Sequence, residues 1–382
     1  LAAAAPARAQ DGRAALARYG CANCHQLPGR PTLGRGSCGG CHREVLGRRR
    51  SGLGRAPHVE HYVHAPDLRN IARRLRPAYL VRFLQDPHDV RPRLEETMPR
   101  LPVTPEDARA IVAFLRASAG PVDVPRAPAP LEANVTPGRA AFRRAGCPGC
   151  HDLGNLDFGV HLPPAAFRGL RQQAYEAPNL RFVRDRLEPD VALAWIRDPR
   201  TIDPNTQMPH PSLTRQDAVA IRDFLFLTDL GDPVRPPPAP RFGAIRALPR
   251  EVRFAEVRRI FNRSCIHCHA HTTGSASASA LGFEATALDL STAAGVRRGT
   301  VLPDGSTRSV LAPDASGVPP LVGRLLRRHE EAARDLRLPR EDTLEPVVRP
   351  APSANVGMPL GLPPVPMRDL RVLVTWIQQG AR

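Results

Sequence analysis

All eight cysteines of this 382-residue chain lie in four copies of one pentapeptide, Cys-x-x-Cys-His. On a helical turn, cysteines at positions i and i+3 share one face, where both sulfurs can bond to a porphyrin. The histidine that follows can bind the iron as its proximal ligand, as in c-type haem attachment. The sequence therefore predicts four covalently bound haem c groups, at Cys21, Cys24 and His25; Cys38, Cys41 and His42; Cys147, Cys150 and His151; and Cys265, Cys268 and His269.

Three other roles of paired cysteines fit this pattern less well. Disulfides would not require a histidine after every pair. Thioredoxin-like chemistry is typical of a βαβ pattern, and none surrounds these motifs. Zinc needs two neighbouring pairs; the first two pairs are separated by thirteen residues, close to zinc-ribbon spacing, whereas the other two have no neighbour. Zinc at the first two motifs therefore stays open as an alternative.

The N-terminal residues resemble the end of a secretory signal. Residues 1–10 are rich in alanine, and Ala7-Arg8-Ala9 fits a small-x-small cleavage site. We therefore expect a mature chain that begins near Gln10 and functions in the periplasm or outside the cell. No apolar run approaches the roughly 18 residues that a membrane span needs, so we expect no transmembrane segment of its own.

The chain is strongly basic, with a formal net charge of +17 and arginine at all 54 basic positions. Arginine pairs well with carboxylates, so part of this charge is expected to offset haem propionates. The rest favours redox partners with acidic docking surfaces, either soluble proteins or a membrane redox complex. Nucleic acid is not an expected partner of an exported haem protein.

Segments around the first and third motifs repeat each other. Gly12-Arg13-Ala14-Ala15 begins nine residues before Cys21, and Gly138-Arg139-Ala140-Ala141 begins nine residues before Cys147. Each predicts a short helix that leads into a motif. In the downstream repeats, Thr-x-x-Asp predicts a capped helix start and the apolar spacing predicts one buried helical face. These repeats pair 65–68 with 177–180, 83–87 with 195–199, and 104–115 with 214–225.

Three of the four methionines stand in Met-Pro pairs downstream of a motif. Met98, Met208 and Met358 occupy matched positions, which favours a role as the sixth iron ligand opposite the histidine. A thioether at that position raises the reduction potential of a haem. Met367, outside such a pair, fits the common role of a pliable core residue.

With these elements, each unit resembles a class I cytochrome c domain: an N-terminal helix, a Cys-x-x-Cys-His motif, a loop with the distal methionine and a terminal helix. The resemblance is good over 10–118 and 135–228, and the third unit is divergent. It implies an all-α fold of three tandem haem domains joined by Pro/Ala-rich linkers, at 10–119, 134–229 and 250–382.

The first of these domains would hold two haems, and the third would have a long insert between His269 and Met358. Within that insert, Ala287-Leu288-Asp289-Leu290 is a candidate strand. The linkers, 120–130 and 232–240, are expected to be semi-rigid and extended, and to keep the haem domains at limited separations.

The extra haem of the first domain needs a ligand of its own. We assign Met98 to the haem at Cys21, although His42 lies 56 residues before Met98, close to the 57 between His151 and Met208. Met98 could thus serve the haem at Cys38 instead. For the haem without a methionine, the sequence offers a histidine cluster, in which we slightly favour His61 over its neighbours His58 and His64.

The expected function is electron transfer by Fe(II)/Fe(III) cycling, as a carrier or as the cytochrome subunit of a respiratory or photosynthetic complex. Three tandem cytochrome domains resemble the electron-accepting subunit of membrane alcohol dehydrogenases, but the fourth haem breaks that match. The alternative is a haem enzyme, such as a peroxidase or a small-anion oxidoreductase, which would need an open iron position. We favour the electron-transfer protein over the enzyme because no other catalytic constellation stands out.

Overall fold

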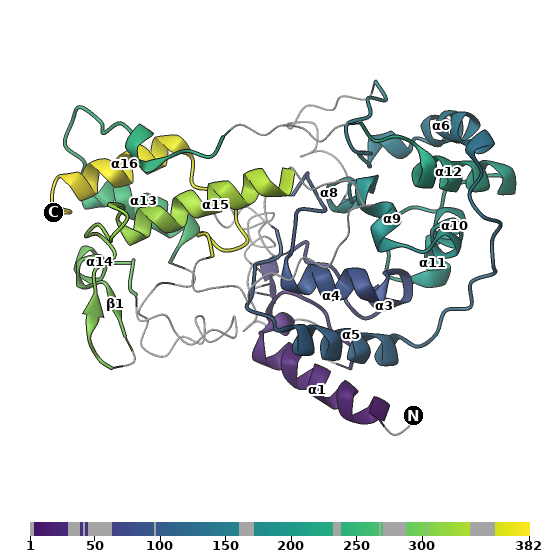
Figure 1. The fold of residues 1–382 in the computed structure, drawn as a ribbon, viewed down its shortest axis with the longest axis horizontal. Helices are drawn as coiled ribbons and strands as arrows, with labels where there is room; N and C mark the ends of the chain where they lie inside the picture. The colour runs from purple at the N-terminus through teal and green to yellow at the C-terminus, as the bar shows by residue number, and fades with distance from the viewer. Residues whose placement is uncertain are drawn as a thin grey trace.

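The computed structural model describes residues 4–29, 39–40, 43–44, 63–94, 97–159, 172–231, 238–266, 269, 288–302, 304–336 and 356–382. This portion is mostly helical, in agreement with an all-α class (Figure 1). The strands found within it are β1 (Thr300–Val301) and β2 (Thr307–Arg308), a short antiparallel pair.

Buried hydrophobic side chains form three clusters that follow one another along the chain. The first draws on residues 15–115, the second on 141–230 and the third on 245–381. We call the surrounding residues the first part (4–119), the second part (132–231) and the third part (238–382).

The first part is organised by the crossing of two helices near Gly12. A Cβ atom on this glycine would stand 2.1 Å from the carbonyl oxygen of Ala110, so only glycine permits the contact. Thr104 caps the second of these helices by accepting a hydrogen bond from the amide of Asp107, as its Thr-x-x-Asp sequence predicts. The elements are α1 (Ala4–Arg18), η1 (Cys21–Asn23), α3 (Ile71–Arg74), α4 (Pro77–Gln85) and α5 (Pro105–Ala119), with the crossing between α1 and α5.

The second part repeats this arrangement. Gly138 lies against Ala220, whose carbonyl oxygen would be 2.0 Å from an added Cβ, and Thr214 caps its helix through the amide of Asp217. The recurrent glycine thus marks a helix crossing, here between α6 and α12 (Figure 1). The elements are η2 (Glu132–Asn134), α6 (Val135–Arg144), η3 (Cys147–Gly149), α8 (Gln172–Glu176), η4 (Leu180–Phe182), α9 (Val183–Arg186), α10 (Pro189–Arg197), α11 (Pro199–Ile202) and α12 (Arg215–Leu227).

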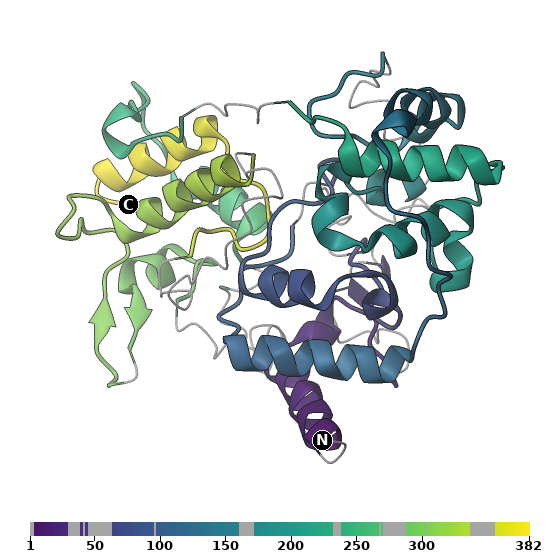
Figure 2. The same ribbon diagram turned by 45° about the vertical axis from the view of Figure 1, so that its right-hand side comes forward.

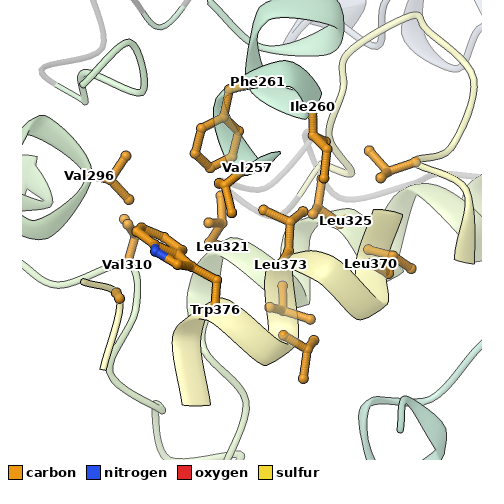
Figure 3. Close-up of a cluster of buried hydrophobic side chains, with 14 of the residues drawn as sticks. Val257, Ile260, Phe261, Val296, Val310, Leu321, Leu325, Leu370, Leu373 and Trp376 are labelled. Carbon is orange, nitrogen blue, oxygen red and sulfur yellow. The ribbon is translucent and has the colours of Figure 1, made fainter. Parts of the chain in front are cut away.

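The third part packs its helices around Trp376, whose ring extends toward Val310 in Figure 3. Two sequence-based expectations fail here. Residues 288–290 form no strand, and Met367 is 41% exposed at the start of the last helix instead of filling the core. The elements, besides β1 and β2, are η5 (Phe242–Ala244), α13 (Phe254–Ser264), α14 (Ala293–Arg298), α15 (Pro320–Leu336) and α16 (Met367–Gln378).

The first and second parts dock closely, with α4 beside α9. The amide of Arg76 donates to the carbonyl oxygen of Arg186 at 2.8 Å, and its guanidinium pairs with Glu188 at 3.0 Å. Arg82 pairs with Asp185 across the same boundary. In Figure 2 these two parts stand together on one side, and the third part lies on the other.

Among the residues that the structure describes, no helix is both long enough and apolar enough to cross a membrane. The expected cleavage site, Ala7-Arg8-Ala9, lies inside α1.

Candidate functional site

The histidines of the first and third motifs are held in the same way. Nδ1 of His25 lies 2.8 Å from the carbonyl oxygen of Pro66, and Nδ1 of His151 lies 2.9 Å from that of Pro178. Because a carbonyl oxygen can only accept, Nδ1 must be the protonated nitrogen. This tautomer leaves the lone pair of Nε2 for a metal ion, and such a second contact is typical of histidine ligands.

His269 of the fourth motif has an equivalent support. Its imidazole hydrogen-bonds to the backbone of Leu288, and its carbonyl oxygen accepts from the amide of Leu290 at 2.8 Å. Residues 288–291 match 66–69 and 178–181 in a further detail. In each segment the second residue is Asp or Asn, and its side chain accepts a hydrogen bond of 2.9 Å from the amide two residues later.

Segment 288–290, interpreted from the sequence as a strand, is therefore the third copy of the histidine support. The one sequence signal for it is weak: Asp67-Leu68 recurs as Asp289-Leu290, but the same dipeptide also occurs at four other places in the chain. It was missed because the preceding residue is leucine in place of proline.

The backbone of the first, third and fourth motifs closes in a tight turn. The carbonyl oxygen of the first cysteine accepts from the histidine amide at 3.0 Å for Cys21, 2.9 Å for Cys147 and 3.0 Å for Cys265. In the first two cases the preceding glycine, Gly20 or Gly146, has the positive φ that begins this turn. The turn therefore places His25 directly after Cys21 and Cys24, and His151 directly after Cys147 and Cys150, within one hydrogen-bonded loop.

Burial sets the protonation of these groups. It lowers the pKa of His25, His151 and His269, so the neutral, metal-binding form of imidazole is favoured. Burial raises the pKa of the Cys21 and Cys147 thiols to about 11. A thiol of this kind is the opposite of the low-pKa cysteine that thioredoxin-like chemistry requires.

One of the three candidate methionine ligands, Met358, packs against the hydrophobic cluster that its motif also contacts. Met358 and Cys265 both pack against the third cluster. Leu101, shortly after Met98, is buried in the same cluster that Cys21 contacts. Met208 receives a hydrogen bond at its Sδ from Nε1 of Trp195, at 2.9 Å.

Several candidate residues lie outside the described residues: Cys38, Cys41, His42, His58, His61 and Cys268. Of the histidine cluster, the structure describes His64, whose Nδ1 lies 3.3 Å from Oε1 of Glu176 in the second part. The haem at Cys38 therefore stays a prediction, as do the other three haems and the assignment of Met98 to one of them. Within the described portion, no group of three or more His, Cys, Asp or Glu side chains is arranged to hold a metal ion.

Arg93 was not identified from the sequence, yet it reaches from the first part to the motif of the second. Its guanidinium lies 2.5 Å from the carbonyl oxygen of Cys150 and 3.4 Å from the carboxylate of Asp152. It also borders a cavity of about 590 Å³ between the three parts. Five arginines line this cavity, namely Arg93, Arg181, Arg263, Arg328 and Arg368.

No family model, curated protein or solved structure matches this chain.

Proposed function

We propose that this chain is an exported tetrahaem c-type cytochrome that transfers electrons between redox partners. The observation that supports this most strongly is the histidine support found in three motifs. His25, His151 and His269 each hydrogen-bond to a backbone segment of the same pattern and each follow a Cys-x-x-Cys turn. A disulfide role would give no reason for this repeated imidazole orientation, and zinc would need a second Cys-x-x-Cys pair near each histidine, which the third and fourth motifs lack.

The residues fit a covalently bound haem, which supplies one-electron Fe(II)/Fe(III) chemistry when bound. Cys21 and Cys24, Cys147 and Cys150, and Cys265 and Cys268 would hold it through thioethers. His25, His151 and His269 would orient their Nε2 toward iron, and Met98, Met208 and Met358 would approach from the opposite side. The buried apolar clusters would exclude water and so favour the less charged, reduced state.

Three tandem class I cytochrome c domains are the architecture that we propose for this function. The glycine crossings at Gly12 and Gly138 support it, because they bring the first and last helices of the first two units together beside a motif. The arginines at the boundaries between the parts would offset propionate charge. The extra haem of the first domain would bind Cys38, Cys41 and His42, with one of His58, His61 and His64 as its distal ligand.

The first test is the mass of the purified, exported protein. We expect four covalent haem additions and no zinc. Fewer than four additions, or stoichiometric zinc, would remove the first two motifs from the proposal.

Ligand-field spectroscopy then separates the carrier from the enzyme. A carrier should contain only six-coordinate haems, whereas a peroxidase or a small-anion oxidoreductase needs an open one. Binding of carbon monoxide by the native protein at one haem would favour the enzyme. If the histidine cluster supplies the distal ligand of the haem at Cys38, replacing His58, His61 and His64 together with alanine should open that haem to carbon monoxide.

The methionine ligands are tested by Met208→His, which should lower the potential of one haem and leave the others nearly unchanged. Met367→Leu is the matched control, because this methionine is exposed and outside a Met-Pro pair. If every potential stayed the same in Met208→His, Met208 would be a packing residue.

A further inference from the structure

The loops that contain Met98 and Met358 touch each other, although they belong to different parts. The amide of Thr97 donates to the carbonyl oxygen of Gly361 at 2.8 Å. Gly361 has φ +69°, and a Cβ added to it would stand 2.8 Å from the carbonyl oxygen of Thr97 and 3.3 Å from Pro99. The two Met-Pro segments are thus in direct backbone contact, through a glycine that no other residue replaces without strain.

Helix α15 supports both loops with two charged side chains. Arg328 donates to the hydroxyl oxygen of Thr97 at 3.3 Å and to the carbonyl oxygen of Leu362 at 2.8 Å. Glu331 accepts from the amide of Gly357 at 2.8 Å and from the guanidinium of Arg100 at 3.2 Å. One carboxylate therefore binds the residue before Met358 and the second residue after Met98.

This network is buried, since Arg328 is 3% exposed and Glu331 is 7% exposed. Charges removed from water interact strongly, and removing one member of a buried pair leaves the other uncompensated. The network therefore fixes the two loops together. By contrast, the loop of Met208 is supported from within the second part, by Thr206 and Trp195.

We infer that the first and third parts form an electron-exchange pair, joined through their methionine loops, in which Arg328 and Glu331 position both methionine ligands. This inference rests on the proposed function. The step is a one-electron exchange, so one part is oxidised as the other is reduced and no bond is made or broken. Arg328 and Glu331 are positioning residues, because they act through Thr97, Arg100 and Gly357.

The test uses the fully haem-loaded protein and the variant Glu331→Gln. Gln keeps an acceptor for the amide of Gly357 but loses the charge that faces Arg100. Glu330→Gln on the same helix is the control, because Glu330 is 53% exposed and pairs with the surface residue Arg327 at 2.9 Å. The readouts are the four midpoint potentials and the charge-transfer absorption of methionine-ligated ferric haem. Met98→His, Met208→His and Met358→His identify which potential belongs to which haem.

We expect Glu331→Gln to shift the potentials of the Met98 and Met358 haems together and to leave the Met208 haem unchanged. Glu330→Gln should shift none of them. Arg100→Gln provides the reciprocal result: although Arg100 belongs to the first part, its loss should also shift the Met358 haem. These readouts do not depend on a physiological partner, and any variant that loses haem or helix content is recognised by its mass and circular dichroism.

Gly361→Val tests the exchange itself. We expect electron exchange between the Met98 and Met358 haems, measured after flash photoreduction, to slow several-fold while exchange with the Met208 haem is retained. If Glu331→Gln shifts only the Met358 haem or none, with four haems and methionine ligation intact, the pair inference is wrong and the proposed function stands. If covalent haem or methionine ligation is absent from the native protein, the proposed function itself fails.

Discussion

Nε1 of Trp195 donates a hydrogen bond of 2.9 Å to Sδ of Met208. Trp195 belongs to α10, and the matching residue of the first part is Phe83, which has no such donor. A hydrogen-bond donor withdraws electron density from the thioether sulfur. The sulfur then stabilises a bound ferric iron less well. The proposed haem of the second part should therefore differ in reduction potential from that of the first part, because Phe83 stands in the first part where Trp195 stands in the second.

Replacing Trp195 with phenylalanine should lower the potential of the Met208 haem. A neutral hydrogen bond contributes about 1 kcal/mol, which for a one-electron couple corresponds to a shift of at most about 40 mV. Phenylalanine keeps a ring for the guanidinium of Arg74, which lies 4.5 Å above the indole. Potentiometric titration of the variant checks the prediction, and an unchanged potential would mean that this bond does not persist in the haem-loaded protein.

Gly138→Ala should destabilise the second part, although alanine is the better helix former. The helix-propensity gain is about 1 kcal/mol. The new Cβ, however, would meet the carbonyl oxygen of Ala220 at 2.0 Å and Cβ of Phe224 at 2.7 Å, so α6 and α12 must separate. Overpacking of this kind costs about 1–3 kcal/mol or more.

Thermal unfolding followed by the absorption of the methionine-ligated haem checks this prediction. Gly243→Ala is the control, because nothing lies within 4 Å of a Cβ at that position. An equal or higher melting temperature for Gly138→Ala would show that the helix crossing tolerates a side chain.

The sequence predicted those features that depend on local spacing. The capped helix starts at Thr104 and Thr214 follow from the Thr-x-x-Asp sequence. The helix crossings at Gly12 and Gly138 explain why Gly-Arg-Ala-Ala recurs before the first and third motifs. Leu288 was misinterpreted because the third copy of the histidine support lacks the proline of the other two.

Contacts between parts were beyond the reach of sequence reasoning. Arg93, Arg328 and Glu331 belong to no repeat and stand in arginine-rich or ordinary helical sequence. Their roles depend on how one part docks on another, which a single sequence does not encode in any local pattern. Met367 was wrongly expected in the core because hydrophobicity alone does not tell which face of a helix start meets solvent.

His88 should make the docking of the first and second parts sensitive to acid. Its ring lies among aromatic rings from both parts, 4.7 Å from Phe182 and 5.3 Å from Phe83. Burial, with a smaller effect of Arg186, lowers the pKa of His88 to about 4. The unfolded chain, with a pKa near 6.5, binds the proton more tightly, so stability is complete above about pH 6.5 and falls as pH drops toward 4.

The shift corresponds to a loss of about 3 kcal/mol across that range. His88→Phe keeps the aromatic contacts and removes the titration, so its melting temperature should fall less than that of the native protein between pH 6.5 and 4.5. Identical pH profiles for His88→Phe and the native protein would contradict this account.

Arg93→Met should loosen the third motif, residues 147–151, without changing the residues of that motif. Methionine keeps the length of the stem but leaves the carbonyl oxygen of Cys150 without its donor at 2.5 Å and Asp152 without its partner at 3.4 Å. Such losses in a largely buried place cost about 1–3 kcal/mol. Hydrogen exchange of residues 147–152 in the haem-loaded protein should therefore accelerate, while exchange in α13 and α16 stays constant.

Arg109→Met, which removes the same charge from an exposed pair with Glu106, is the control for net charge. Equal exchange of 147–152 in both variants would mean that Arg93 acts only through its charge, and that the contact with the motif does not hold the first and second parts together.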